Sequence, residues 1–515
     1  MRRGVLPTFL NYFSQKGWTV VMQISTFLPL NTGMTALDAA SQAESVIANN
    51  IANANTPGYA QEVAQLGEYG AFPVLPSGNA PLLSGQTGEG VTVNQVTRQI
   101  SAFYNAQDRV NQGSYQMYKA HNDILTQIEG ILNEPSSQSM QHALDQFFAS
   151  WQTLSTDPGN TAAAQAVVSQ AQSLGQTFQS VGNQLSAMQA NLQTVVGTAQ
   201  SSAQGGPSGQ LGELVSYAAQ VAQLNSQIVS ASQTGASPNT LEDQRSVLLD
   251  KMAQLANIKY FQDPQMTGGA TPTPKYPGYL DVTLSAGNQT IYLVGPPGSP
   301  PQPAPTDAAL LGAITSGSIA GNVAGITDVR NTLAYLNAYM QNLASQVNQA
   351  YGGAVFNVNP TGTGTPPADS PVVYLTTASA FTASSLSTAG SANPGNNSTA
   401  QAVANVQNAT TAFSYNLYNS ITGVPSSTQN FTGTFDQGVA QIVSSIGTET
   451  ANTISSEQTA NALAQQSSQL RQSVSGVDIN QQAAQMVQYQ NAYSAAAKFI
   501  TVFDQMIQTL LASVP

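Results

Sequence analysis

The segment from Ser475 to Leu511 carries an apolar stripe with helical spacing. Steps of four and three residues along it reach ten positions, and eight of these are apolar or aromatic. Such spacing is typical of a helix that packs lengthwise on another helix. Phe503, Met506 and Leu510 widen the apolar face, so more than one neighbour is expected. The ten positions are Ile479, Ala483, Met486, Gln490, Tyr493, Ala497, Ile500, Asp504, Ile507 and Leu511.

A second apolar stripe runs from about Leu30 to Asn55, near the other end of the chain. Its spacing of three or four residues again predicts one face of a helix. We expect the two terminal helices to pair, because each has an apolar face that needs a partner. The stripe contains Leu30, Met34, Leu37, Ala40, Ala43, Ile47 and Ile51.

An asparagine-rich stretch marks the end of this first helix. Asparagine is a poor helix-interior residue because its amide competes for backbone hydrogen bonds. The sequence Thr56-Pro57-Gly58-Tyr59 then predicts a turn. Pro57 would fix φ at the second position, and Gly58 would supply a positive φ at the third.

Length and composition predict a mainly α protein with several parts. A chain of 515 residues is too long for one core. Helical spacing covers most of residues 101–260, 319–351 and 436–471, whereas Pro, Gly, Ser and Thr dominate 263–308 and 352–434. We therefore expect paired, coiled-coil-like terminal helices, an elongated helical domain and β-rich insertions.

The expected domains follow from these segments. Residues 1–21 are expected to be an N-terminal extension. Polar residues interrupt their apolar run, which argues against a secretory signal, and Met22 is the expected start. The others are a terminal helical domain of 22–60 with 475–515, a helical domain of 61–262 with 317–351 and 435–474, a small β insertion at 263–316, and a variable β-rich or loop insertion at 352–434.

Composition excludes several classes of partner. Charged residues make up 7% of the chain, and 13 Lys and Arg leave a net charge of −12. No basic patch is available to hold a phosphate backbone, so we expect no nucleic-acid binding. The absence of cysteine excludes disulfides, thiolate metal sites and a cysteine nucleophile. No apolar run reaches the length of a membrane helix, so membrane insertion is not expected.

Residues for catalysis are scarce. His121 and His142 lie in helical sequence without metal-ligand spacing or a nucleophile motif, and we expect two partly exposed helix histidines. Glu242 and Asp243, with Arg245 and Lys251 nearby, are interpreted as a solvated charged face. We therefore expect no catalytic, cofactor or metal residues, and a structural protein rather than an enzyme.

A secreted hydrolase of peptidoglycan is the enzymatic alternative. It would need a pair of carboxylates, and the insertion at 352–434 holds Asp369 as its single acid. The alternative is therefore disfavoured.

Both terminal segments resemble a known family. ANNIANANTPGYAQE, from Ala48 to Glu62, resembles the N-terminal motif shared by bacterial flagellar rod, hook and hook-associated proteins. SGVDINQQAAQMVQYQNAYSAAAKFITVFDQMIQTLL, from Ser475, is similar to their C-terminal motif. The sequence at Tyr489-Gln490 resembles the hook-associated members, whereas hook and rod proteins more often carry Ala before the Gln. The family often has acidic residues where this chain has Gln481-Gln482.

The resemblance implies an assembly role for both segments. On the N-terminal side the implied residues are Leu37, Ile47, Asn49, Asn50, Ile51, Asn53, Thr56, Pro57, Gly58 and Tyr59. On the C-terminal side they are Gly476, Val477, Ala483, Met486, Tyr489, Gln490, Tyr493, Ala497, Ile500, Met506 and Leu510.

The resemblance also implies a place in the cell. Such proteins are exported by the flagellar type III apparatus with an export chaperone, and they polymerise as a ring-like layer at the distal end of the hook. There they contact copies of themselves, the hook protein and a second hook-filament junction protein, outside the cell. The terminal helices would line the innermost wall, the helical domain would form the next shell, and the β-rich insertions would face outward. A hook or distal rod protein of the same superfamily is the alternative.

Overall fold

The computed structural model divides the chain into two compact units. Unit 1 is Met1–Gln99 with Ser475–Pro515, and unit 2 is Ile100–Val474. The expectations about residues 1–21 and Asp369 lie outside the described residues. The structure describes residues 28–70, 88–134, 136–199, 206–262, 276–287, 289–296, 306–360, 373–388, 396–418 and 425–513.

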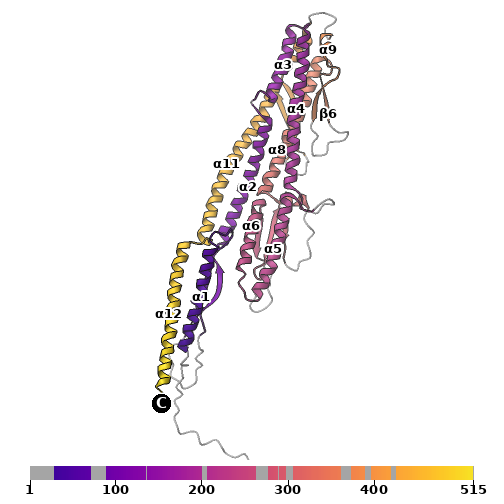
Figure 1. Ribbon diagram of the computed structural model, residues 1–515. Helices are drawn as coiled ribbons and strands as arrows, with labels where there is room; N and C mark the ends of the chain where they lie inside the picture. The colour runs from indigo at the N-terminus through magenta and orange to yellow at the C-terminus, as the bar shows by residue number, and fades with distance from the viewer. Residues whose placement is uncertain are drawn as a thin grey trace, which may run out of the picture. The chain divides into compact units, whose positions relative to one another are not determined.

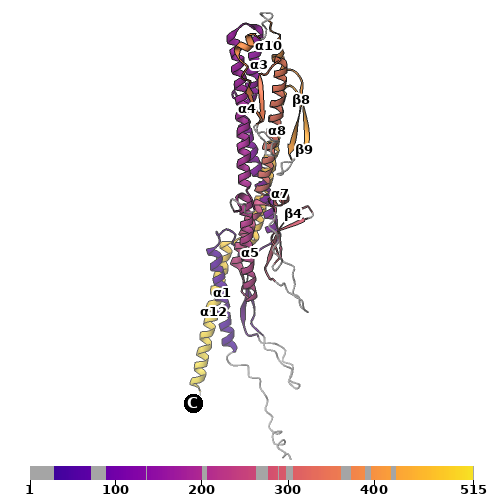
Figure 2. The same cartoon turned by 90° about the vertical axis from the view of Figure 1, so that its right-hand side faces the viewer.

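Unit 1 consists of two helices and a hairpin. Helix α1 (Leu28–Ala52) lies side by side with α12 (Ile479–Ala512), as Figures 1 and 2 both show. Strand β1 (Glu62–Glu68) pairs antiparallel with β2 (Val91–Arg98), with Glu62 opposite Arg98, and both strands contact α1. The prediction that the terminal helices pair is confirmed.

Unit 2 is mainly helical. Its longest helices lie where helical spacing predicts them, and those that contact one another most extensively include α2 with α8, α3 with α4, and α5 with α6. The helices are α2 (Ala102–Leu132), α3 (Met140–Thr156), α4 (Thr161–Val196), α5 (Gly209–Gln233), α6 (Asn239–Leu255), α7 (Asp307–Ala313), α8 (Ser318–Tyr351), α9 (Ala383–Thr388), α10 (Ser398–Val406) and α11 (Phe435–Ser475).

Three small antiparallel sheets accompany these helices among the described residues of unit 2. Their strands lie in and beside the two segments expected to be β-rich, and between 373 and 433 the structure adds the helices α9 and α10. The sheets are β3 (Lys259–Gln262), β4 (Leu280–Ala286) and β5 (Gln289–Val294) in the order β3-β4-β5; β6 (Phe356–Pro360) with β7 (Val373–Thr377); and β8 (Thr411–Tyr418) with β9 (Pro425–Gly433).

The core of unit 2 forms two clusters. The larger joins α2, α3, α4, α8, α10 and the start of α11 around aromatic side chains such as Trp151, Phe178 and Tyr339, all at most 1% exposed. The rings of Phe178 and Tyr339 stack with centroids 5.8 Å apart. The smaller cluster lies between α5, α6, α7, the start of α8 and the β3-β4-β5 sheet. Unit 2 therefore has an extensive interior of its own.

Glycines let α2 and α8 approach closely. A Cβ built on Gly321 of α8 would lie 2.2 Å from the carbonyl oxygen of Met117 on α2, and one on Gly325 would lie 2.4 Å from Ile124. The first obstacle is backbone, which cannot rotate away. The close contact therefore depends on the missing side chain.

Gly321→Ala should destabilise unit 2 by about 1–3 kcal/mol, because the added methyl group forces the two helices apart. Gly130→Ala is the matched control in α2, since a Cβ there meets nothing within 4 Å. That control should stabilise by about 0.5–1 kcal/mol, because alanine restricts the unfolded chain more than glycine does. Thermal unfolding measures both; a neutral Gly321→Ala would contradict the packing argument.

Two carboxylates meet where α3, α10 and α11 come together. Gln141 Nε2 donates to Asp145 (3.2 Å) and Asp436 (3.1 Å), and Gln407 Nε2 bonds to the same two side chains. Burial first, and then the charge of Asp436, raises the pKa of the Asp145 carboxyl. The ionised pair therefore weakens unit 2 at neutral pH.

Asp145→Asn should raise the melting temperature of unit 2 at neutral pH, because it removes a half-buried charge. A raised pKa means that the folded state binds the proton more tightly than the unfolded state does. The stability of the wild type should therefore rise as the pH falls through the raised pKa toward the ordinary value of a carboxyl group. The variant should lack that part of the rise. Melting curves at neutral and mildly acidic pH test this, and identical pH slopes in both proteins would contradict it.

Candidate functional site

The end of α1 is built as the sequence predicts. The Tyr59 amide donates to the Thr56 carbonyl oxygen over 3.2 Å, which closes a turn with Pro57 and Gly58 at its centre. Gly58 has a φ of 81°, the left-handed conformation that glycine adopts without strain. The predicted turn is confirmed.

One asparagine ties four segments of unit 1 together. Asn50 is 1% exposed. Its Nδ2 donates to the Glu62 carbonyl oxygen (2.8 Å) and to Gln482 Oε1 (3.0 Å). Its Oδ1 accepts from the Glu62 amide (2.9 Å) and from the Tyr59 hydroxyl (2.7 Å). The side chain therefore joins α1 to the turn, to the first residue of β1 and to α12.

The neighbouring asparagines form a local chain of hydrogen bonds. Asn49 Nδ2 lies 3.3 Å from the Tyr59 hydroxyl, and Asn53 Nδ2 donates to Asn49 Oδ1 over 2.9 Å. The Thr56 hydroxyl donates to Asn53 Oδ1 over 3.1 Å. These bonds join the side chains of the asparagine-rich stretch to one another and to the turn.

The start of α12 is joined to the same region. The Gln61 amide donates to the Ser475 carbonyl oxygen over 2.9 Å, just before Gly476 and Val477. Asp478 then caps α12, and its carboxylate accepts from the amides of Asn480 and Gln481. An N-cap aspartate of this kind stabilises a helix by about 1 kcal/mol.

The row of α12 that faces α1 is shifted by one residue from the predicted row. Gln482 and Phe503 are buried, at 1% and 5% exposure, whereas Ala483 and Asp504 are exposed. The predicted and observed rows share Met486, Ile500 and Ile507, which are half-buried, and Tyr493, which is 39% exposed. Of the other predicted assembly residues, Tyr489 and Ala497 are half-buried, and Gln490, Met506 and Leu510 are exposed.

The shift has a simple cause. Apolar residues occupy rows on both sides of the contact, so counting in fours and threes cannot choose between neighbouring rows. On α1, Ile47 is buried and Leu37 and Ile51 are half-buried, but Met34 is 57% exposed. A Cβ on Gly33 would lie 3.0 Å from both Phe499 and Ile500, so the contact on α1 includes small residues that the stripe left out.

The hydrophobic core of unit 1 is very small. Four of its six members are alanine, which buries little apolar area. The two helices and the hairpin therefore have few contacts with which to offset their conformational entropy. Among the described residues of unit 1, the buried hydrophobic side chains are Ala39, Ala40, Ala43, Ile47, Ala60 and Phe503.

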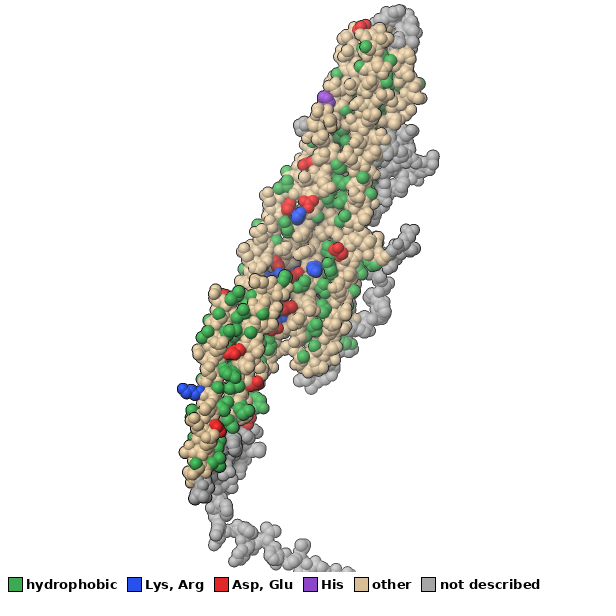
Figure 3. Space-filling model, in the orientation of Figure 1, with side chains coloured by type: hydrophobic (Ala, Val, Ile, Leu, Met, Phe, Trp, Pro, Cys, Tyr) green, Lys and Arg blue, Asp and Glu red, His purple; other side chains and the backbone are tan. Residues whose placement is uncertain are grey.

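A stripe of large apolar side chains remains exposed on α12. Phe499, Val502, Met506 and Leu510 are 46%, 57%, 51% and 55% exposed. Their spacing of three, four and four residues places them along one face of the helix. Figure 3 shows hydrophobic side chains gathered along the part of the molecule formed by α1 and α12. We call these four residues the α12 stripe.

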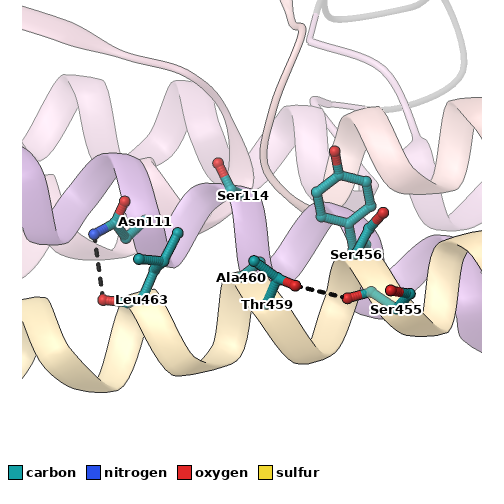
Figure 4. Close-up of a pocket in the computed structure, with 8 residues that line it drawn as sticks. Asn111, Ser114, Ser455, Ser456, Thr459, Ala460 and Leu463 are labelled. Carbon is teal, nitrogen blue, oxygen red and sulfur yellow. Dashed lines mark hydrogen bonds between the residues drawn. The ribbon is translucent and has the colours of Figure 1, made fainter.

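Unit 2 contains a groove between α2 and α11. Its volume is about 340 Å³, and no carboxylate, amine or imidazole lines it. Asn111 donates to the carbonyl oxygen of Leu463 at one end, and the Thr459 hydroxyl is bonded within α11 (Figure 4). The lining is Asn111, Ser114, Tyr118, Ser455, Ser456, Thr459, Ala460 and Leu463. The groove offers no group for acid–base chemistry near neutral pH.

Charged side chains in unit 2 join helices. Arg109 and Arg471 both bind Asp250, over 2.6 and 2.8 Å, and Arg471 also binds Asp108 over 3.2 Å. These bridges connect α2, α6 and α11. Among the described residues, no group of three or more His, Cys, Asp and Glu could hold a metal ion.

One sequence interpretation needs correction, and another is confirmed. Asp243 and Arg245 are not on a solvated face: they are 8% and 6% exposed, and Arg245 donates to Asn225 Oδ1 over 2.8 Å. The error arose because helical position alone did not reveal that Arg245 of α6 is held by Asn225 of α5 and by the carbonyl oxygen of Gly278. The histidine prediction is confirmed: His142 is exposed, and His121 is half-buried with its Nε2 2.6 Å from Asp328 Oδ2.

No described helix is, by itself, long and apolar enough to cross a bilayer. The bent pair α7 and α8 passes the same test of length and composition when taken together.

The comparisons with known families cover the middle and both ends of the chain. The model of the flagellar hook-associated protein FlgK helical domain matches residues 125–363. The model of the flagella basal body rod protein matches residues 30–59, and that of the flagellar basal body rod FlgEFG protein C-terminal region matches 468–513. Flagellar hook-associated protein 1 of Bacillus subtilis is 34% identical over 46% of this chain. Over these segments the chain is similar to the FlgK family of flagellar hook-associated proteins.

Further flagellar hook-associated proteins are similar to parts of this chain. Flagellar hook-associated protein 1 of Salmonella typhimurium is 29% identical over 52% of this chain. The match spans 44% of the length of the Bacillus and Salmonella proteins. The flagellar hook junction protein FlgK from Burkholderia pseudomallei is 16% identical, with a TM-score of 0.45, over 72% of this chain and 100% of that one.

Proposed function

We propose that this chain polymerises at the distal end of the flagellar hook and forms the junction between hook and filament. The proposal rests on how unit 1 distributes its apolar side chains between core and surface. Its core is mostly alanine, while the α12 stripe leaves four large apolar side chains exposed. Association with neighbouring copies would cover the stripe and supply the missing core.

Assembly would then be the activity of the terminal helices. Binding that occurs only to the folded form stabilises that form by mass action. A terminal unit that is weakly stable alone and stable among neighbours suits a chain exported unfolded and assembled at its destination. In this proposal the Asn50 cluster, formed by Asn50, Tyr59, Glu62 and Gln482, holds α1, β1 and α12 together. The α12 stripe makes the contacts between copies.

The partners and the domain roles belong to the same proposal. The chain would contact copies of itself in a ring, the hook protein and a second hook-filament junction protein. It would reach them outside the cell through the flagellar type III export apparatus, with an export chaperone. Residues 22–60 with 475–515 would form the inner wall of the tube, and the insertions at 263–316 and 352–434 would face outward.

A hook or distal rod protein is the second candidate. The matches of both chain ends to rod-protein families favour it, because such ends are shared among layers of the same tube. Deletion of the gene separates the two candidates. Cells that build hooks but release filament protein into the medium would support the junction proposal. Cells that fail to build the hook would contradict it and support the second candidate.

A further inference from the structure

Methionine is the single source of sulfur in this chain, which has no cysteine and 11 methionines. Two described methionines are more than half exposed: Met34 at 57% and Met506 at 51%. Both lie in unit 1, on α1 and α12. By contrast, four methionines of unit 2 are buried at 8% exposure or less, namely Met140, Met188, Met252 and Met340.

We propose that Met506 is a peroxide-sensitive modification site whose oxidation to the sulfoxide blocks self-assembly. The inference rests on the proposed function, because it assumes that the α12 stripe is covered by a second copy. It adds a chemical control of that contact. The reagent class is a peroxide such as hydrogen peroxide.

The reaction is a two-electron oxygen transfer. A lone pair of the Met506 sulfur attacks one peroxide oxygen, an S–O bond forms and the O–O bond breaks. The thioether is oxidised to the sulfoxide, and the second peroxide oxygen leaves as water after a proton shift. No other residue takes part in this step. Access of peroxide to the sulfur controls the rate, and 51% exposure provides that access.

The position of Met506 makes its oxidation consequential. It lies within the α12 stripe, with Val502 one turn before it and Leu510 one turn after it. A sulfoxide oxygen is a strong hydrogen-bond acceptor, and neither apolar neighbour can donate to it. Burying that acceptor unpaired should weaken association about tenfold or more. Met34 is on α1, outside the stripe, and provides an internal comparison.

Assembly would in turn protect Met506. A copy within the assembled layer would cover the stripe and shield the sulfur from peroxide. Unassembled chains are therefore the sensitive form.

The test compares the full-length wild type, Met506→Leu and Met34→Leu, each with and without hydrogen peroxide. Leucine is chosen because it is similar in volume to methionine and carries no sulfur. Mass spectrometry of digests measures the sulfoxide at each methionine, and light scattering measures assembly. Each protein is compared with its own untreated sample, so any effect of the substitution itself cancels. Methionine sulfoxide reductase is then added to the treated samples.

We expect peroxide to oxidise Met34 and Met506 at least about tenfold faster than Met252 and Met340, which are 0% and 1% exposed. Assembly of the wild type and of Met34→Leu should fall about tenfold and recover with the reductase, whereas Met506→Leu should lose less than about twofold. Equal losses in Met506→Leu and the wild type would overturn the inference, as would normal assembly of fully oxidised wild type. Untreated wild type that never assembles would contradict the proposed function itself.

Discussion

Val502→Asp should abolish self-assembly and leave the folding of unit 2 unchanged. Val502 is 57% exposed, so in the free chain the new carboxylate remains in water and little packing is lost. Between two copies the same carboxylate would be buried among apolar side chains. An unpaired buried charge costs several kcal/mol, and each 1.4 kcal/mol is a tenfold change. We therefore expect association at least about 100-fold weaker.

The control for this variant is Gln508→Asp. Gln508 is exposed and lies two residues from both Met506 and Leu510. Two residues turn the helix by about 200°, so Gln508 points away from the α12 stripe. The Gln508→Asp variant adds one negative charge to α12, as Val502→Asp does. Sedimentation or light scattering over a range of concentrations measures assembly, and equal assembly of both variants would show that the stripe is not the contact.

Asn50→Ala should unfold most of unit 1 in the free chain. The substitution leaves the Glu62 amide, the Glu62 carbonyl and Gln482 Oε1 without the partner that Asn50 supplies, at distances of 2.8 to 3.0 Å. Loss of several buried hydrogen bonds costs about 2–4 kcal/mol. With so small an apolar core, unit 1 cannot absorb a loss of that size.

Circular dichroism and limited proteolysis measure the effect of Asn50→Ala. Helical signal should fall by the contribution of α1 and α12, and cleavage near the Thr56–Tyr59 turn should accelerate at least about tenfold, in line with the loss of stability. Asn55→Ala is the control, because Asn55 lies in the same stretch and is exposed. It should behave as the wild type. Unchanged proteolysis of Asn50→Ala would show that the hydrogen bonds of Asn50 do not stabilise unit 1.

Local sequence patterns predicted the helices and the turn because their causes are local. Apolar spacing predicted α1 and α12, and Pro57 with Gly58 predicted the turn that the structure contains. These signals depend on neighbours within a few residues. The assignment of the assembly residues themselves stays a prediction.

Features that depend on distant contacts were not predicted. Gln482 pairs with Asn50 across 432 positions of sequence, and nothing in either local pattern links the two. The row of α12 that faces α1 depends on Gly33 and the alanines of α1, which carry little periodic signal. Burial of Arg245 depends on its contacts with Asn225 of α5 and with Gly278. In each case, tertiary packing determines which of several acceptable faces is covered.

Hydrogen exchange along α12 tests the central claim most directly. The claim is that unit 1 completes its core only when copies assemble. The backbone amides of Ile479–Ala512 should exchange much faster in the dilute monomer than those of α8, which is deeply packed in unit 2. In the assembled layer the α12 amides should become strongly protected. Strong protection of α12 in the monomer, unchanged on assembly, would contradict the account.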